Sequence, residues 1–141
     1  MTELIFQILN SVGFNHPLHP AMTHVPMGMI MGGFVFGIVS FFLRKPELAR
    51  TAYHCFVLAL IGILPTMLLG YMDWQHTYEG EWSTPVVLKM ILAVSLGVLL
   101  VFAVKLGRKT EPVSAKVMVI YALCLINTIG LGFLGGELQY G

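Results

Sequence analysis

The chain has 141 residues, of which 57% are hydrophobic and only 11% are charged. A soluble domain carries roughly twice that proportion of charge, so the composition indicates a membrane protein. A net charge of +1 provides no basic surface for nucleic acid, and the segments outside the apolar runs are too short for a separate soluble domain. We therefore expect a single transmembrane domain over residues 1–141.

The segment Met1–Phe14 contains no Lys or Arg. A secretory signal peptide would open with positive charge and carry a small-residue cleavage site, and this segment has neither. Apolar residues recur in it at helical spacing, at Leu4, Ile5, Ile8, Leu9 and Val12. This pattern is typical of a short amphipathic helix lying on the membrane surface, and a frayed terminus is the other interpretation.

Four long apolar runs follow one another along the chain. They lie at Val25–Leu43, Tyr53–Met72, Pro85–Val104 and Val117–Leu134. Each has about 18–20 residues, and a helix of that length, rising about 1.5 Å per residue, crosses a hydrocarbon core of about 30 Å. The sequence therefore predicts an all-α fold, an integral membrane four-helix bundle with its spans over these runs.

Proline marks the beginning of one span and interrupts another. Thr84-Pro85 has the pattern of a helix cap residue followed by a proline at the first helical position. Pro65 lies inside the second span and removes the hydrogen bond to the Ile61 carbonyl, which predicts a kink.

Small and polar residues indicate how the helices pack. The first span contains two small-x-x-x-small pairs, Gly28/Gly32 and Gly33/Gly37. Such pairs allow helix backbones to approach closely, and they also leave room for a flat ligand. Asn127 lies in the middle of the fourth span and predicts an interhelical hydrogen bond.

Lysine and arginine are concentrated in two of the three loops. The first and third loops, with the helix ends beside them, contain Arg44, Lys45, Arg50, Lys105, Arg108, Lys109 and Lys116. The middle loop, Asp73–Thr84, contains three acids and no Lys or Arg. By the positive-inside rule, the first and third loops face the cytoplasm, while the middle loop and both termini lie outside.

The two cysteines, Cys55 and Cys124, both lie inside predicted spans. A disulfide at membrane depth is not expected. The sequence has no Cys-x-x-Cys-His motif, which excludes covalent attachment of a c-type haem. We interpret both cysteines as small core residues.

Four of the five histidines lie near the outer ends of the spans: His16, His19, His24 and His76. His54 opens the second span on the cytoplasmic side, about 30 Å away. Neutral imidazole is the commonest protein ligand of transition metals and of haem iron. The cluster predicts a b-type haem with His24 as one axial ligand. The other is His76, or His19 turned back by Pro20. Hydrogen bonding to lipid headgroups is the alternative interpretation.

Lys89 is a charged residue about one and a half turns inside the third span, on the outer side. A charge at that depth usually faces a partner or a cavity. Asp73, Glu81 and Glu137 lie on the same side and are candidate partners. Lys89 either snorkels to the interface, neutralises a haem propionate, holds a quinone oxygen, or ligates a metal after losing its proton.

Methionines interleave with the first histidines, at Met22, Met27, Met29 and Met31. Thioether and imidazole ligands together suit copper, so His19 and His24 are also candidate ligands of a metal ion. Residues two apart point to different sides of a helix, and apolar packing accounts for most of these methionines.

Three stretches of this sequence resemble the DUF2231 family of predicted four-span bacterial membrane proteins. They are His19-Pro20-x-x-x-His24-x-Pro26, Gly70-Tyr71-Met72-Asp73 and Gly135-Gly136-Glu137-Leu138-Gln139-Tyr140-Gly141. Together they cover nearly the whole chain. The resemblance implies the four-span fold, in a multi-pass protein of the bacterial inner (cytoplasmic) membrane. Relatives joined to cytochrome-type modules imply redox work.

One position departs from the family pattern. Relatives often have a histidine early in the third span, where this chain has Lys89. If that histidine is an axial ligand in relatives, this chain needs a different second ligand, such as His19, His76 or Lys89 itself.

Three functions follow from these features. The first is an electron-transfer subunit rather than a stand-alone enzyme. It binds haem b, and also quinone, at His19, His24, His76 and Lys89. It passes electrons between the quinone pool and a periplasmic partner, which is a cytochrome or an iron–sulfur subunit. Both subunits belong to a hetero-oligomeric respiratory complex. The second is a non-catalytic anchor or assembly subunit, and the third is a copper-handling membrane protein. An absorption spectrum separates the first function from the others.

Overall fold

The computed structural model describes Gln7, Ser11 and residues 19–77, 80–109 and 112–140, with the backbone alone at 19–21, 77 and 137–140. Four α-helices fill these residues: α2 (His19–Leu43), α3 (Pro46–Thr77), α4 (Thr84–Gly107) and α5 (Ala115–Tyr140). All four are long and apolar enough to cross a membrane. The predicted all-α, four-span fold is therefore confirmed. The predicted interfacial helix over Met1–Phe14 lies outside the described residues, apart from Gln7 and Ser11.

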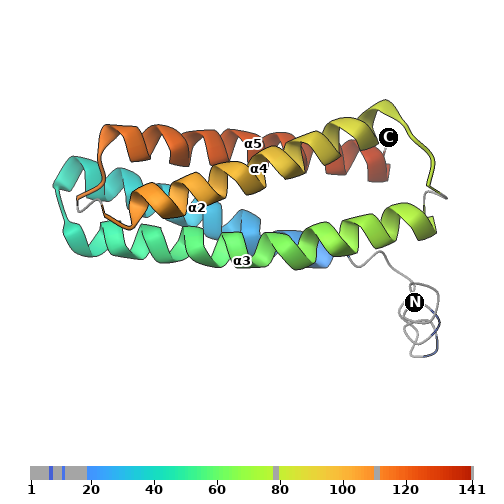
Figure 1. Ribbon diagram of the computed structural model, residues 1–141, viewed down its shortest axis with the longest axis horizontal. Coiled ribbons are helices and arrows are strands. Elements are labelled where there is room, and N and C mark those ends of the chain that lie inside the picture. Colours follow the sequence, from blue (N-terminus) through green and yellow to red (C-terminus); the bar gives the residue numbers. More distant parts are fainter. Residues whose placement is uncertain (1–6, 8–10, 12–18, 78–79, 110–111, 141) are drawn as a thin grey trace.

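The four helices run alongside one another in an antiparallel bundle (Figure 1). Helix α2 packs against α3 and α5, and α4 packs against the same two helices. Helices α2 and α4 therefore occupy one diagonal of the bundle, and α3 and α5 occupy the other. The α2–α3 and α4–α5 connections lie at one end, and the α3–α4 connection lies at the opposite end (Figure 1).

Each helix extends beyond the apolar run that predicts it, because the polar residues at the ends also adopt helical structure. The longest helix, α3, has 32 residues and continues through Pro65 as one helix. Helix α4 begins one residue earlier than the cap pattern predicts. Its N-cap is Ser83, which makes no side-chain capping bond, and Thr84 is already helical.

The outward face of every helix is apolar. Phe42 on α2, Leu64 on α3, Phe102 on α4 and Phe133 on α5 are 75%, 66%, 52% and 74% exposed. In water such a surface would cause aggregation, whereas in a bilayer it contacts acyl chains. These exposed side chains are the lipid-facing girdle of the bundle.

Two aromatic rings fill the centre of the bundle. Phe56 on α3 stacks on Tyr121 of α5 across the diagonal, and both side chains are fully buried. The glycines around the rings leave them room: a Cβ at Gly33 would lie 2.8 Å from the Phe56 ring, and a Cβ at Gly37 would lie 2.9 Å from the Tyr121 ring. The close packing predicted for Gly33/Gly37 is therefore confirmed.

The close packing predicted for Gly28/Gly32 is wrong for the part of the chain that the structure describes, where a Cβ at either residue would meet nothing within 4 Å. Cys124 is buried, as expected of a core residue, whereas Cys55 is only half-buried, and both cysteines are free. Asn127 makes the predicted interhelical bond, with its Nδ2 donating to Ser95 Oγ of α4 at 2.6 Å.

Charge divides the two ends of the bundle. The end with the α2–α3 and α4–α5 connections, called the basic end here, carries Arg44, Lys45, Arg50, Lys105, Arg108, Lys109 and Lys116, all exposed. The end with the α3–α4 connection, called the acidic end, carries Asp73 and Glu81. Lys89, the eighth of the chain's eight Lys and Arg residues, also lies toward the acidic end.

Candidate functional site at the acidic end

An aspartate and a lysine lie within the bundle at the acidic end, the first buried and the second half-buried. Asp73 lies near the end of α3 and is only 5% exposed. Lys89 lies in the second turn of α4, is half-buried, and is electrostatically attracted to Asp73. The short connection between the antiparallel helices α3 and α4 brings the end of one beside the start of the other. Asp73 is thus the described acid that attracts Lys89, and the Glu137 side chain lies outside the described residues.

The Lys89 ammonium also faces a third helix. A Cβ at Gly135 of α5 would lie 3.7 Å from Lys89 Nζ. The charged end of Lys89 therefore lies against the backbone of α5, on the opposite side of the bundle from α3. A charge in this position is costly unless a partner compensates it, and such residues in membrane proteins are usually functional.

An aromatic cluster lies next to Asp73 along the chain. The indole rings of Trp74 and Trp82 are 4.8 Å apart, and Trp74 also contacts Tyr71 at 5.7 Å. Trp74 Nε1 donates a hydrogen bond to the Glu81 carbonyl at 2.9 Å, which fixes the α3–α4 connection. Tryptophan and tyrosine gather at the level of lipid headgroups. Asp73, which precedes Trp74 in the chain, therefore lies close to that level.

A hydroxyl on α3 lies beside a backbone carbonyl that a proline in α2 leaves without its helical hydrogen bond. Pro26 lacks an N–H, so the Met22 carbonyl loses its partner within the helix. Thr66 Oγ1 of α3 lies 3.3 Å from that carbonyl and 2.7 Å from the Gly62 carbonyl of its own helix. A Cβ at Gly62 would lie 3.5 Å from Pro26 Cδ, so the two helices approach closely here.

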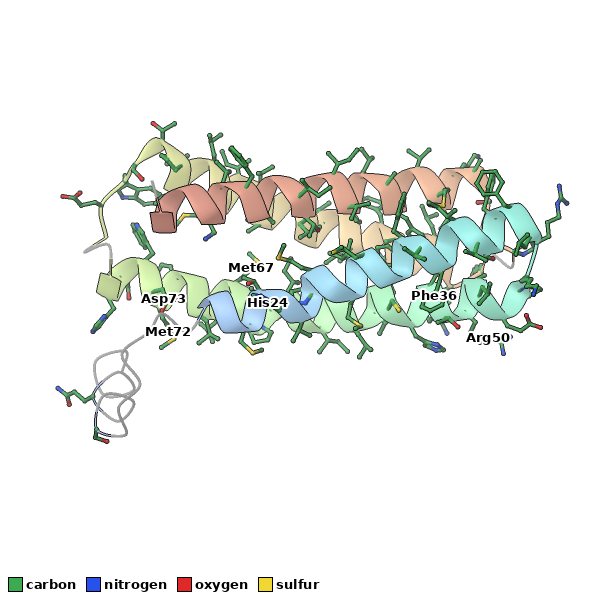
Figure 2. The ribbon with its side chains drawn as sticks, turned by 180° about the vertical axis from the view of Figure 1, so that it is seen from behind. His24, Phe36, Arg50, Met67, Met72 and Asp73 are labelled. Atoms are coloured by element: carbon green, nitrogen blue, oxygen red, sulfur yellow. The ribbon has the colours of Figure 1, made fainter. Side chains whose placement is uncertain are left out.

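This contact fixes the depth of His24. Met22 lies opposite Thr66 in the antiparallel pair, so His24 lies at the level of about residue 64 of α3. His76 lies about 12 residues further along α3. At about 1.5 Å per residue, the two histidines are separated by about 18 Å along the bundle axis. Figure 2 shows the same order, with His24 further from the acidic end than Asp73. Both imidazoles are exposed.

The predicted turn at Pro20 is wrong. Helix α2 begins at His19 and runs unbroken through His24, because a proline in the first turn of a helix removes no intrahelical hydrogen bond. Two residues five apart on one helix lie about 7.5 Å apart along its axis and point to different sides. They do not reach opposite faces of one porphyrin. The His19 side chain lies outside the described residues, and His16 is not described at all.

His24 and His76 therefore do not lie across one iron, and the helix backbone separates His24 from His19. Pairs that involve His16 or the His19 side chain lie outside the described residues. Among the side chains that the structure describes, no group of three or more His, Cys, Asp or Glu residues is placed to hold a metal ion. His54 is exposed in the basic half, as predicted, apart from the other histidines.

Comparison with known families agrees with this architecture. The family model described as predicted membrane protein (DUF2231) matches residues 15–141. The chain belongs to the DUF2231 family. No curated protein and no solved structure matches it.

Two of the three stretches that resemble DUF2231 contribute to the acidic end of this DUF2231 protein. The first lies deeper in the bundle and contains Pro26, whose missing N–H leaves the Met22 carbonyl facing α3. The second ends in the buried Asp73. The third begins with Gly135, against which the Lys89 ammonium lies.

The sequence alone did not identify the contact between Thr66 and Met22. The signal was available, since any proline inside a helix frees a carbonyl four residues earlier. Which neighbouring hydroxyl satisfies that carbonyl depends on the register of α3 against α2, and the register is not visible in the sequence.

Proposed function

We propose that this protein is the membrane subunit of a redox complex and that it binds a quinone at the acidic end. Electrons pass between the bound quinone and an outer-face partner, a cytochrome or an iron–sulfur subunit. One observation supports the proposal above all others: the Lys89 ammonium lies half-buried in an apolar bundle, against the backbone of α5 and within the electrostatic influence of the buried Asp73.

The chemistry of quinone reduction matches these two groups. A quinone takes up two electrons and two protons to become a quinol, and its carbonyl oxygens gain negative charge as the electrons arrive. The Lys89 ammonium donates a hydrogen bond to one such oxygen and stabilises that charge. The Asp73 carboxyl group lies near the headgroup level and exchanges protons between the quinol oxygen and water. The partner subunit supplies or receives the electrons.

The surroundings of the site suit the rest of the ligand. The lipid-facing girdle borders the acidic end, and Leu88 and Ile91 flank Lys89 in the sequence with exposures of 46% and 58%. An isoprenoid tail reaches such a site from the bilayer without entering water. A water-soluble substrate would instead need a polar approach.

The proposal assigns no step to haem, since the described histidines do not face one another. Haem b with His24 as one axial ligand remains a second prediction. A Soret band in the native protein, lost in His24→Ala while the helix content is retained, supports it.

Binding of a short-chain benzoquinone to the full chain in mild detergent tests the proposal. Trp74 and Trp82 lie beside the site, so their fluorescence reports binding. We expect saturable quenching in the native protein. Lys89→Met should weaken binding at least about tenfold, because it removes one hydrogen bond to a charged group. Lys105→Met, at the opposite end of the same helix, is the matched control and should bind normally.

A different result of the same titration would contradict the proposed quinone site. Quenching that rises linearly with quinone concentration, and is equal in all three proteins, indicates partition into the detergent and overturns the proposal. The anchor function then remains. A colourless preparation bears only on haem, and metal analysis of that preparation bears only on copper.

A further inference from the structure

Hydrogen bonds of one side chain join the two connections at the basic end. The Ser40 hydroxyl, fully buried at the end of α2, donates a hydrogen bond to the Lys45 carbonyl at 2.9 Å. It also accepts one from the Val113 N–H at 3.4 Å. One side chain thus joins the α2–α3 connection to the α4–α5 connection, and the basic residues of both connections belong to a single surface.

The backbone of this end is fixed as well. Arg44 has a φ of 50°, a left-handed conformation that is uncommon for a residue with a side chain. The turn between α2 and α3 depends on it. Two long helices, α3 and α5, begin at this end, so the positive ends of their dipoles point toward it. The first turn of α5 contains Lys116 and no acid. A lysine there opposes the helix dipole, so a bound anion stabilises the arrangement.

Positive charge dominates the surface. Seven basic side chains are exposed at this end, against the acids Glu47, in the first turn of α3, and Glu111, which lies outside the described residues. Each basic group adds attraction for anionic phosphate at a membrane surface.

The charge continues directly into the lipid-facing girdle. Phe102 and Leu106 are 52% and 44% exposed at the end of α4, immediately before Arg108 and Lys109. Phe42 and Leu43 are 75% and 61% exposed immediately before Arg44. A ligand that matches this surface has an anionic head and apolar chains. A free phosphate matches only the charged part.

We propose that the basic end is a binding site for an anionic phospholipid with two phosphate groups, of the cardiolipin type. Arg108, Lys109 and Lys116 hold the phosphates, and the acyl chains lie along Phe102 and Leu106. Ser40 keeps the site in shape by joining the two connections. This site is separate from the quinone site and does not depend on it.

The test uses the full chain, delipidated in a neutral detergent, with cardiolipin as the probe and phosphatidylcholine as the comparison lipid. Native mass spectrometry should show one retained cardiolipin per chain, and cardiolipin should raise the melting temperature more than phosphatidylcholine does. In Arg108→Gln/Lys109→Gln/Lys116→Gln, affinity should fall on the order of a hundredfold, because each basic residue contributes about a fivefold factor.

A charge-preserving variant, Arg108→Lys/Lys109→Arg/Lys116→Arg, is the matched control and should retain most of the binding. Circular dichroism verifies that both triple variants are folded. Equal retention of cardiolipin by the native protein and the neutralised variant overturns the proposal. Stabilisation by inorganic pyrophosphate equal to that by cardiolipin also overturns it and assigns the surface to a soluble anion.

Discussion

Phe56 and Tyr121 stack across the diagonal of the bundle, with ring centroids 3.8 Å apart and ring planes inclined by 18°. They come from helices that do not pack directly against each other, so the ring pair itself links α3 to α5. The Tyr121 hydroxyl is buried without a hydrogen-bond partner among the described residues. A Cβ at Gly107 of α4 would lie 2.6 Å from that hydroxyl.

Gly107→Ala should destabilise the bundle by about 1–3 kcal/mol, because the added methyl group overlaps the Tyr121 hydroxyl. Tyr121→Phe removes the hydroxyl and should rescue most of that loss in the double variant. Gly32→Ala, which adds a methyl group where nothing lies within 4 Å, is the control and should be near neutral. Detergent-unfolding midpoints measure all four proteins, and the absence of any rescue would contradict this account of the contact.

Tyr121→Phe alone should leave stability unchanged or increase it. A buried hydroxyl without a partner contributes nothing in the folded state and is costly to bring out of water. The same unfolding midpoints measure the effect. A loss above about 1 kcal/mol would show that the hydroxyl has a bonded partner in the membrane.

Thr66→Val should destabilise the protein by at most about 1 kcal/mol, because the Met22 carbonyl loses a donor that it shares with the Gly62 carbonyl. In the Pro26→Ala background the same change should cost less, since residue 26 then supplies an N–H to that carbonyl. Thr51→Val removes a hydroxyl that bonds only within α3, to the Glu47 carbonyl, and is the matched control. Additive effects of Thr66→Val and Pro26→Ala in the double-mutant cycle would refute the compensation.

Asp73→Asn should destabilise the acidic end by about 1–3 kcal/mol. This is below the cost of about 3–5 kcal/mol for breaking a fully buried pair, since Lys89 is partly exposed. Asp73→Asn/Lys89→Met removes both charges and should be more stable than Asp73→Asn. Unfolding midpoints again provide the measurement. If the double variant is the less stable of the two, the attraction between these groups does not account for their position.

The sequence predicts the helices of this protein better than the contacts between them. Length and hydropathy locate all four spans, because the bilayer imposes one minimum length on every apolar helix. Gly28/Gly32 and Gly33/Gly37 present the same pattern, yet only the second pair packs closely, because Phe56 and Tyr121 lie opposite that pair. The predicted turn at Pro20 fails because the first turn of a helix tolerates proline. In each case the deciding partner is distant in the sequence.

For the candidate site, too, the sequence predicts individual residues better than the contacts between them. Burying a charge is costly wherever it occurs, so Lys89 was recognisable from its depth alone. Its partner was not, because Asp73, Glu81 and Glu137 lie at one end and only the fold selects among them. The histidines formed a cluster in the sequence, whereas the register of α2 against α3 separates His24 from His76 in space.

The length of α3 has a mechanical consequence. Its 32 residues extend about 48 Å, and the hydrocarbon core measures about 30 Å. An upright α3 therefore protrudes from the membrane by roughly 18 Å in total, which is about three turns shared between its two ends. These turns extend α3 beyond the lipid at both ends, near Glu47 and near His76. They leave helical surface outside the bilayer that a neighbouring subunit can contact.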